Sequence, residues 1–537
     1  MAVSSSLLRV PIDVPNRSGH NLDHSNSFTG KTGTLYPVLC HELLPNDTIS
    51  LGNALQVQFP PMVTDFYGKV DFVLEAFFVP NRLLWGGWQD FITHPTANPQ
   101  YPEGAAVQAK PKIVPYFKVP DSIQGNYEIG PHDLLHYLDY GDRVLQSGGS
   151  GTLPGTGPSY RTSVLKAMAY HRIWDDWYRD SRIQAPVFYR PVSANTNAVP
   201  NYPGWLPYLS TDQSGEAYSV DITSSFEDGH RFTALRQRNW VKDYFTTASL
   251  LPQAGGASEV KFDLDVDEEA GAFSISTLRA ANSLQMWLER NNIAGYRYSD
   301  QIYAQFGIYP ADAIMDRPLY LGRNINTVYS RSVFSTVKQG DEIPLGTKGA
   351  NSQVIGEGSL IDSFTASEHG FVMVLASLVP KPVYGSGADR SSYRTRVGDF
   401  AFPLLAGMGD QAILKRELTG HSADVGTFGY TDLYAEYKFI NDKVHGLLRD
   451  GQTLDKFVLQ RSFDSRGSVL GTQFLQIPQN YLDQVQAVDT STAGYSYWSE
   501  IAFSFKKIST IPAYSQPTLA NLEYAHKEYM SRGGKRL

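Results

Sequence analysis

The sequence has almost no cysteine: Cys40 is the only one among 537 residues. A single cysteine excludes an intramolecular disulfide and a cysteine-based zinc site. We expect Cys40 to be buried and inert, because apolar residues typical of a strand surround it. These features predict a protein that is made and kept in a reducing cytosol.

Long apolar runs and an excess of positive charge are also missing. The N-terminus, MAVSSSLLRVPIDVP, lacks the long apolar segment of a signal peptide. The most apolar run, GFVMVLASLVP from Gly370, is too short to span a bilayer, and we expect a buried strand there. Lys and Arg number 46 against 54 Asp and Glu, and this net charge of -8 argues against a surface that binds nucleic acid everywhere. We therefore expect no membrane contact and no general affinity for nucleic acid.

Aromatic residues, glycine and proline are abundant and indicate many strands and turns. Aromatic residues make up 12% of the chain, beside 46 Gly and 31 Pro. Strand-like alternation occurs mainly at about 34–80 and about 365–510. Helical periodicity occurs at about 162–180 and about 277–291. We expect residues of about 81–364 to be insertions of helices and loops between two groups of strands.

The ends of the chain differ from this central part. Residues 1–30 are polar, with little to bury, and predict an extended arm. The chain has no internal repeat and no clear linker, so we expect one domain over residues 1–537. The tail at 515–537 is basic. It is a candidate for contacts with nucleic-acid phosphates, although a solvated tail without a partner explains it equally well. The candidate residues are Lys527, Arg532, Lys535 and Arg536.

The stretch HRIWDDWYRD, residues 171–180, combines carboxylates with aromatic rings and is the first candidate for an active site. On a helix, Arg172 meets Asp176 and Asp175 meets Arg179 at i,i+4 spacing. Carboxylates paired with arginine keep a low pKa and are poor general acids. Tyr170, Trp174, Trp177 and Tyr178 form one wide aromatic face on the same helix. The pattern therefore favours packing over catalysis.

Three further motifs have simpler explanations than chemistry. TGKTG at 29–33 lacks the first glycine of a phosphate-binding loop and indicates a polar turn. DLDVDEE at 263–269 lacks the glycine of a calcium loop and indicates an exposed strand. His132 and His136 have metal-ligand spacing, but a surface helix explains them as well. The sequence predicts no catalytic residue, no metal ligand and no cofactor.

Several blocks carry a resemblance to a known family. They occur in the order found in that family and cover most of the chain. The blocks are FVLEAFFVPNRLLWGGWQDF from Phe72, AYHRIWDDWYRD from Ala169, DYFTTASLLPQAG from Asp243, the segment Leu278 to Gly322, FAFPLLAGMGDQAILKREL from Phe400, FGYTDLYAEYKFINDKVHGLLR from Phe428 and PAYSQPTL from Pro512. Together they resemble the major capsid protein of the Microviridae, small tailless icosahedral single-stranded DNA phages, in a divergent gokushovirus-like branch.

The resemblance implies a mainly β fold, an eight-stranded antiparallel jelly roll with long insertions. It implies a T=1 icosahedral shell of roughly sixty copies around a circular single-stranded DNA genome. Its expected partners are the packaged DNA, a small basic DNA-packaging protein, a DNA pilot protein and a host cell-surface receptor contacted by variable loops. We expect the chain in the virion, after assembly in the host bacterial cytoplasm. Structural and interface roles are expected for Trp85, Trp88, Trp174, Trp177 and Tyr178.

Two other classes of function stay open at this stage. The many Trp and Tyr residues near carboxylates are also typical of a carbohydrate-active β-sandwich enzyme or a glycan-binding module. That hypothesis needs two unpaired carboxylates in an aromatic cleft. A nucleic-acid-binding module that acts through the basic tail predicts salt-dependent DNA binding.

Overall fold

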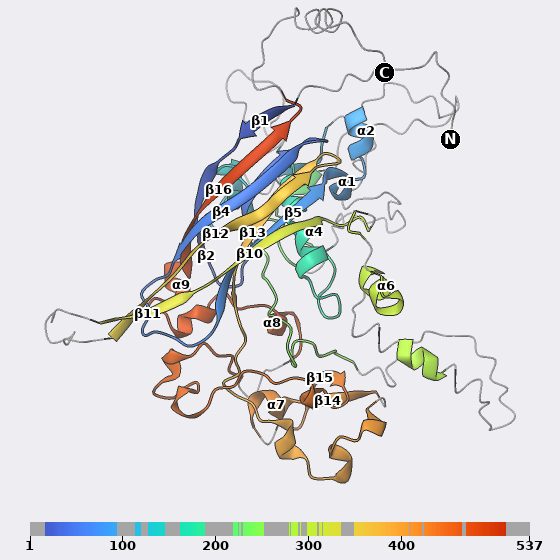
Figure 1. Ribbon diagram of the computed structural model, residues 1–537, viewed down its shortest axis with the longest axis vertical. Coiled ribbons are helices and arrows are strands. Elements are labelled where there is room, and N and C mark those ends of the chain that lie inside the picture. The colour runs from blue at the N-terminus through green and yellow to red at the C-terminus, as the bar shows by residue number, and fades with distance from the viewer. Residues whose placement is uncertain are drawn as a thin grey trace, which may run out of the picture.

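Two antiparallel sheets form the centre of the molecule in a computed structural model (Figure 1). The structure describes residues 17–93, 113–119, 127–144, 162–187, 219–223, 225–226, 229–251, 279, 281–287, 290, 298–308, 311–313, 315–334, 348–406, 409–421, 424–463 and 469–511. The six-stranded sheet consists of β1 (Ser18–Asn21), β2 (His24–Gly30), β4 (Thr48–Gln58), β11 (Tyr329–Phe334), β12 (Lys348–Thr365) and β16 (Tyr497–Ser509). The four-stranded sheet consists of β3 (Tyr36–Leu43), β5 (Val70–Pro80), β10 (Leu319–Thr327) and β13 (Gly370–Pro380).

The order of pairing is that of a jelly roll. The six-stranded sheet runs β1–β16–β4–β12–β11, with β2 also paired to β16, and the four-stranded sheet runs β10–β5–β13–β3. From β2 to β5 each successive strand joins the other sheet, and β12, β13 and β16 alternate in the same way. Such alternation places the two sheets face to face around one core. The expected mainly β jelly roll is confirmed, although these two sheets contain ten described strands where eight were expected.

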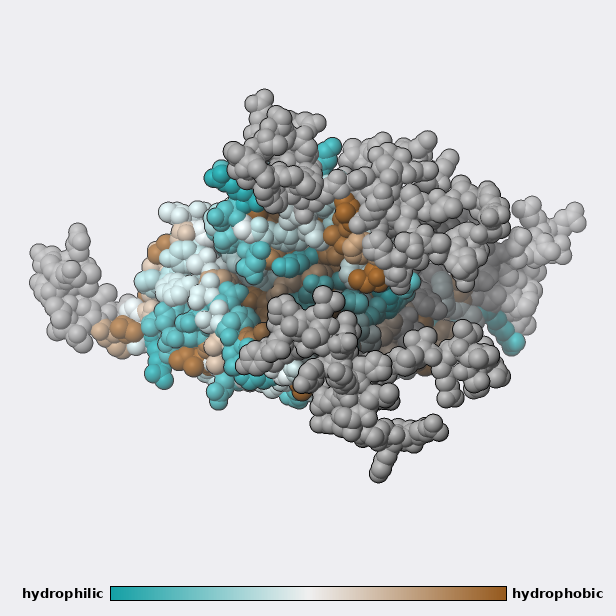
Figure 2. Space-filling view, turned by 90° about the horizontal axis from the view of Figure 1, so that it is seen from above, coloured by the Kyte–Doolittle hydropathy of each residue, from teal (hydrophilic) through white to brown (hydrophobic). Residues whose placement is uncertain are grey.

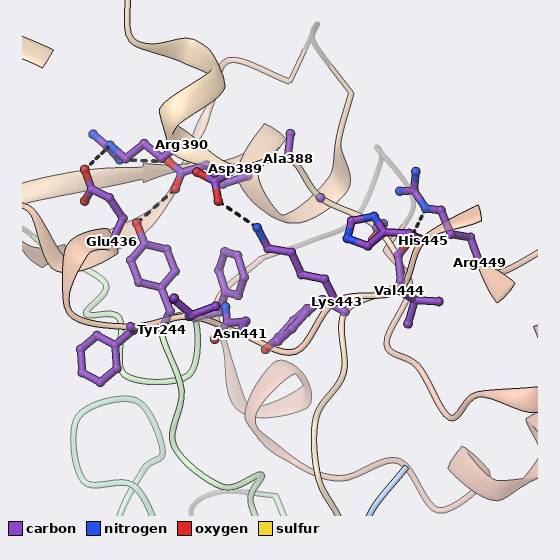
Figure 3. Close-up of a pocket in the computed structure, with 18 residues that line it drawn as sticks. Tyr244, Ala388, Asp389, Arg390, Glu436, Asn441, Lys443, Val444, His445 and Arg449 are labelled. Atoms are coloured by element: carbon purple, nitrogen blue, oxygen red, sulfur yellow. Dashed lines mark hydrogen bonds and ion pairs between the residues drawn. The ribbon is translucent and has the colours of Figure 1, made fainter. Parts of the chain in front are cut away.

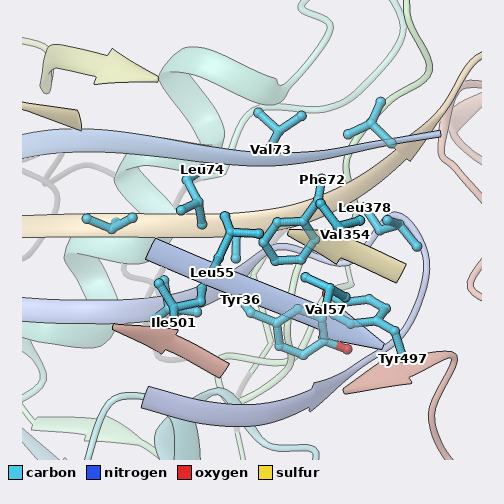
Figure 4. Close-up of a cluster of buried hydrophobic side chains, with 14 of the residues drawn as sticks. Tyr36, Leu55, Val57, Phe72, Val73, Leu74, Val354, Leu378, Tyr497 and Ile501 are labelled. Carbon is cyan, nitrogen blue, oxygen red and sulfur yellow. The ribbon is translucent and has the colours of Figure 1, made fainter. Parts of the chain in front are cut away.

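The apolar run from Gly370 is a buried strand, as expected. All eleven residues of β13 are buried, because one face meets the core between the sheets and the other is covered by helices. β16 has one buried and one exposed face, with strict alternation from Tyr497 to Ser509. The core between the sheets gathers Tyr36, Leu55, Phe72, Val354 and Tyr497 (Figure 4).

Strands occur outside the two predicted segments. β1 and β2 pair with β16 inside residues 1–30, where an arm was expected. β10, β11 and most of β12 lie inside residues 81–364, where insertions were expected. The polar N-terminal strands form because they hydrogen-bond along an edge of the sheet, which requires little apolar burial. Apolar alternation, the signal used for strands, does not detect such elements.

Helices cover the outer face of the four-stranded sheet. This cover consists of α1 (Asn81–Leu84), α3 (Leu134–Tyr137) and α4 (Leu165–Ile173), with a π-helical turn at Trp174–Tyr178. A second buried cluster lies between these helices and the sheet. The remaining described elements of this part are α2 (Trp88–Thr93), α6 (Tyr298–Phe306) and two small strand pairs, β6 (Tyr116–Lys118) with β9 (Ser219–Asp221) and β7 (Tyr127–Glu128) with β8 (Arg143–Val144). Residues 281–287 are helical, as expected.

The segment after β13 forms a separate layer below the sheets in Figure 1. We call the described residues of 384–475 the lower layer. They include only two short strands, although strands were expected throughout about 365–510. Its elements are β14 (Asp410–Leu414), β15 (Thr427–Asp432), α7 (Lys415–Thr419), α8 (Thr472–Leu475) and several 3₁₀ turns, and α9 (Thr490–Ala493) follows it. A small third cluster, which includes Phe245, Ile413 and Phe474, supports this layer.

Candidate functional site: buried polar networks and the exposed lower layer

The carboxylates of the 171–180 stretch are neutralised by arginines. Arg172 Nε lies 2.8 Å from Asp176 Oδ2, and Arg179 Nε lies 2.5 Å from Asp175 Oδ1. These are the two i,i+4 pairs that the sequence predicts. Asp175 also accepts a hydrogen bond from the backbone N–H of Val187. Carboxylates that are already paired with arginines do not supply the unpaired acid that a glycosidase needs.

The five tryptophan and tyrosine candidates lie in the interior of a single chain. Trp85 has no exposed surface, Trp88 is 9% exposed, and Trp174 is 2% exposed. The indole N–H of Trp177 donates to the Pro318 carbonyl at 3.0 Å, and Tyr178 donates to Glu75 at 2.5 Å. All five therefore pack within the chain, and their contact with a neighbouring copy stays a prediction.

A buried ion pair joins this helix to the four-stranded sheet. Arg238 lies 2.6 Å from the Glu75 carboxylate, which also accepts the hydrogen bond from Tyr178. Burial, and then the charge of Glu75, raise the pKa of Tyr178. Glu75 is the one charged residue in the otherwise apolar run from Phe72 to Val79, and this charge is the signal of the network in the sequence. The arrangement fixes the helix on the sheet and leaves no free acid or base.

A pocket in the lower layer is lined by several charged side chains (Figure 3). It encloses about 150 Å³ between Tyr244, Asp389, Arg390, Glu417 and other residues. Arg390 and Tyr244 both donate to the carboxylate of Glu417, at 2.9 and 3.1 Å. Burial raises the pKa of Glu417. The hydrogen bond from Lys443, at 2.8 Å, lowers the pKa of Asp389.

These pairings make the pocket a stabilising network. Each of its three carboxylates, including Glu436 against Arg394 at 2.6 Å, already has a cationic partner. A general acid or a nucleophile needs a group that can reach a substrate in a suitable protonation state. Among the described residues, no three His, Cys, Asp or Glu side chains are grouped so that they could hold a metal ion.

The outer surface of the lower layer is unusually apolar. Leu404 and Ile440 are each 93% exposed. Large apolar side chains that are exposed in this number favour contacts with other proteins. Other exposed members are Val397, Phe400, Phe402, Val425, Tyr437, Phe439, Leu447, Leu454 and Val469. The sequence signal was present in FAFPLL from Phe400, which was interpreted only as a family block.

The remaining candidates are placed as follows. Residues 29–33 form the end of β2 and a turn, so the polar turn is confirmed. Cys40 is only partly buried, although it was expected to be buried; desolvation raises the pKa of its thiol to about 12, which favours the unreactive thiol form. The calcium-loop mimic at 263–269 and the four basic residues of the tail lie outside the described residues. No helix in the described part of the chain is long and apolar enough to cross a membrane.

Comparisons with known proteins agree with the fold. The family described as capsid protein (F protein) matches residues 9–519. Capsid protein VP1 of Chlamydia phage 1 is 26% identical over 96% of this chain and 97% of that protein. Capsid protein VP1 of Bdellovibrio phage phiMH2K is 24% identical over 86% of this chain and 89% of that protein. Capsid protein VP1 of Spiroplasma virus 4 is 23% identical over 94% of this chain and 96% of that protein.

The family match spans nearly the whole chain. The similarity of the chain to the phage capsid proteins extends over both sheets and the lower layer. A chain with a jelly-roll core, paired carboxylates and a large exposed apolar surface has the properties of a structural subunit. The resemblance to gokushovirus-like capsid proteins is thereby confirmed. The chain belongs to the capsid protein (F protein) family of phages and is a structural component of the virion.

Proposed function

We propose that roughly sixty copies of the chain assemble into a T=1 icosahedral shell around a circular single-stranded DNA genome. The exposed apolar surface of the lower layer carries this proposal. Covering Leu404, Ile440 and their neighbours with a second copy removes apolar surface from water, and this provides the driving force for assembly. Catalysis has no part in this function.

The packaged DNA is contacted mainly through other components. The net charge of -8 is unfavourable for a long phosphate backbone, so a small basic packaging protein neutralises most of the genome. The basic tail of the chain, with Lys527, Arg532, Lys535 and Arg536, adds local contacts with phosphates. A DNA pilot protein completes the particle.

Attachment to the host is assigned to the long loops between strands. Loops that extend from a rigid sheet scaffold vary without loss of the fold, and binding residues occur often in such segments. A host cell-surface receptor is therefore the external partner. Assembly takes place in the bacterial cytoplasm, where the single cysteine stays reduced.

The test is the mass and composition of the particle formed with the native neighbouring genes present. About sixty copies of a 59.6 kDa chain give a species of about 3.6 MDa or more, with nucleic-acid absorbance at 260 nm. A stable species of only one to three chains without nucleic acid would refute the proposal. Deleting residues 527–537 tests the tail, with the DNA content per particle as the readout.

A further inference from the structure

A two-stranded ribbon, called the hairpin below, projects from one edge of the six-stranded sheet; it consists of residues 329–334 of β11 and 348–353 of β12, and residues 335–347 lie outside the described part of the chain. β11 pairs with residues 348–353 of β12, whereas β4 pairs with β12 only from Gln353 onward. Apart from a bridge between Ala350 and Met62, the outer half of the hairpin extends past the neighbouring strands. Figure 1 shows β11 at the lower-left margin of the sheets. Among the described strands, none pairs with the outer edge of β11.

The β11 strand of this hairpin exposes three large apolar side chains. Tyr329 and Val333, on one face, are 67% and 53% exposed, and Phe334, on the other, is 57% exposed. Figure 2 shows apolar side chains at the same left margin of the molecule. Proteins normally protect an edge strand with charges, proline or a bulge. β11 has only Arg331, which is exposed and has no partner in the described part of the chain.

A groove crosses the opposite part of the same sheet. Its floor is formed by β2, β4 and β16, its wall by the segment 131–139, and its volume is about 680 Å³. Trp498 is 39% exposed in the groove, and its indole N–H donates to Gln58 at 3.1 Å. The acidic residues that line it are Asp139 and Glu500, and no lysine or arginine is among the lining residues.

The groove and the hairpin are complementary in size and charge. Adjacent strands lie about 4.8 Å apart, so a floor of three strands is about 10 Å wide and accommodates a two-stranded ribbon. Arg331 lies between two apolar side chains on its strand, and the groove offers aromatic surface beside two carboxylates. Tyr329, Gln353, Gln58 and Trp498 follow one another across a single row of the sheet. Within this row β12 and β4 lie between Tyr329 and Trp498, so β11 of a chain cannot reach Trp498 of the same chain.

We propose that the β11–β12 hairpin of one copy lies in the Trp498 groove of a second copy, with Arg331 paired to Glu500. This inference rests on the proposed function, because it needs a second copy of the chain in the assembly. Tyr329 and Val333 lose their exposed surface against Trp498 and the floor of the groove. Each copy gives one hairpin and receives one, so the contact propagates around the shell.

Charge reversal of the full chain, expressed with its neighbouring genes, tests this contact. Arg331→Glu and Glu500→Arg each place like charges together, and we expect each to lower the particle yield in sedimentation by about tenfold or more. The double variant restores the pair and returns the yield to within about threefold of the wild-type chain. The matched control is Glu357→Arg, which reverses an exposed acid on the same face of the sheet outside the groove and does not rescue Arg331→Glu.

Two outcomes would overturn the docking. One is a wild-type yield for Arg331→Glu. The other is a double variant as poor as the single variants, although the single variants unfold at the same denaturant concentration as the wild-type chain. Particles of the wild-type chain decide the proposed function separately, so the two failures are distinguishable.

A cysteine pair tests the same contact without a change of charge. Val333→Cys and Ser27→Cys place one thiol on the hairpin and one in the groove, and the inert Cys40 does not compete. After mild oxidation of the particles, we expect disulfide-linked dimers and longer chains that disappear on reduction. Particles that contain only monomers under these conditions would refute the contact.

Discussion

The six-stranded and four-stranded sheets, which together we call the barrel, and the lower layer are stabilised in different ways. In the barrel, large apolar side chains such as Phe72, Phe505 and Tyr497 are completely or almost completely buried between two regular sheets. In the lower layer, short turns are held by ion pairs around Glu417 and Glu436, and large apolar side chains face outward. The barrel is therefore stabilised by its own core, whereas we propose that the lower layer completes its apolar burial against another copy.

Arg461 shows how the lower layer compensates for its small core. It is 8% exposed and lies over the rings of Trp240 and Phe474, at 4.6 and 4.4 Å from their centroids. Its guanidinium donates to the Tyr384 hydroxyl at 3.2 Å and to the Phe474 carbonyl at 2.8 Å. A single cation thus joins aromatic residues from three separate segments of the chain.

The largest effect on stability is expected in the barrel. Phe72→Ala removes a fully buried ring that packs edge-on against Tyr497, with the two ring centroids 5.8 Å apart. The free energy of unfolding should fall by about 3–5 kcal/mol. Urea unfolding of the unassembled chain measures this change. Phe72→Leu is the control and should lose less than half as much. Equal losses for both variants would mean that the cavity is not the cause.

The next effect is expected at Arg461. Arg461→Ala removes two charge-assisted hydrogen bonds and the contacts with the rings, so we expect the free energy of unfolding to fall by about 2–4 kcal/mol. Arg461→Lys keeps the charge but lacks the planar donors, and it should recover only part of the loss. Full recovery by lysine would show that charge alone matters at this position. The measurement is again urea unfolding, with fluorescence of Trp240 as a local probe.

A smaller effect concerns acid stability at the junction between the two regions. Burial alone would raise the pKa of Asp180, but the hydrogen bonds and charge of Arg182 lower it to about 2. Because the pKa in the folded state is below the ordinary value of 3.8, Asp180 stabilises the fold above about pH 4. This contribution, about 2 kcal/mol, is lost as the pH falls toward 2.

Asp180→Asn tests this dependence on pH. The variant should be less stable at pH 6 and should lose less stability than the wild-type chain between pH 4 and pH 2. Asp389→Asn is a useful comparison, because Asp389 is more exposed and lies in the lower layer. If Asp180→Asn lost as much unfolding free energy as the wild-type chain between pH 4 and pH 2, this result would contradict the role assigned to the ion pair of Asp180 with Arg182.

The smallest effect on stability should accompany a large effect on assembly. Leu404→Ser and Ile440→Ser change side chains that are 93% exposed, so the unassembled chain should change in stability by less than about 0.5 kcal/mol. Particle yield should nevertheless fall strongly, because these side chains are expected to be covered in the shell. Exposed polar positions such as Ser391 serve as controls in the same layer. Normal assembly of both serine variants would refute the role of this surface.

Some parts of the fold were predictable because local patterns decide them. The apolar run of β13 and the alternation in β5 are sufficient to predict strands. The i,i+4 pairs of Arg172 and Arg179 were also predictable, because a helix fixes the distance between their partners. The packing that the same argument favoured for this helix is seen in the structure.

Other parts were hidden because distant contacts decide them. β10 faces β12 with polar residues: Asn324 donates to Asn53 at 3.1 Å, and a Cβ at Gly358 would lie 2.5 Å from Asn324 Nδ2. Asparagine opposite glycine gives no apolar alternation, so this part of the barrel was assigned to insertions. The exposed surface of the lower layer was missed for the same reason, since burial of Phe400 or Ile440 depends on the whole fold.

The pairing of β16 has a consequence for synthesis. This strand lies between β4 and the first two strands, β1 and β2, although more than 400 residues of chain separate it from them. The six-stranded sheet therefore cannot close while the chain is being translated. The edge of β4 that pairs with β16 stays unpaired until residues 497–509 leave the ribosome. Folding that depends on such remote partners is slow and exposes strands to aggregation. Because the six-stranded sheet closes late, the yield of folded subunits should depend on the help with folding that the producing cell provides.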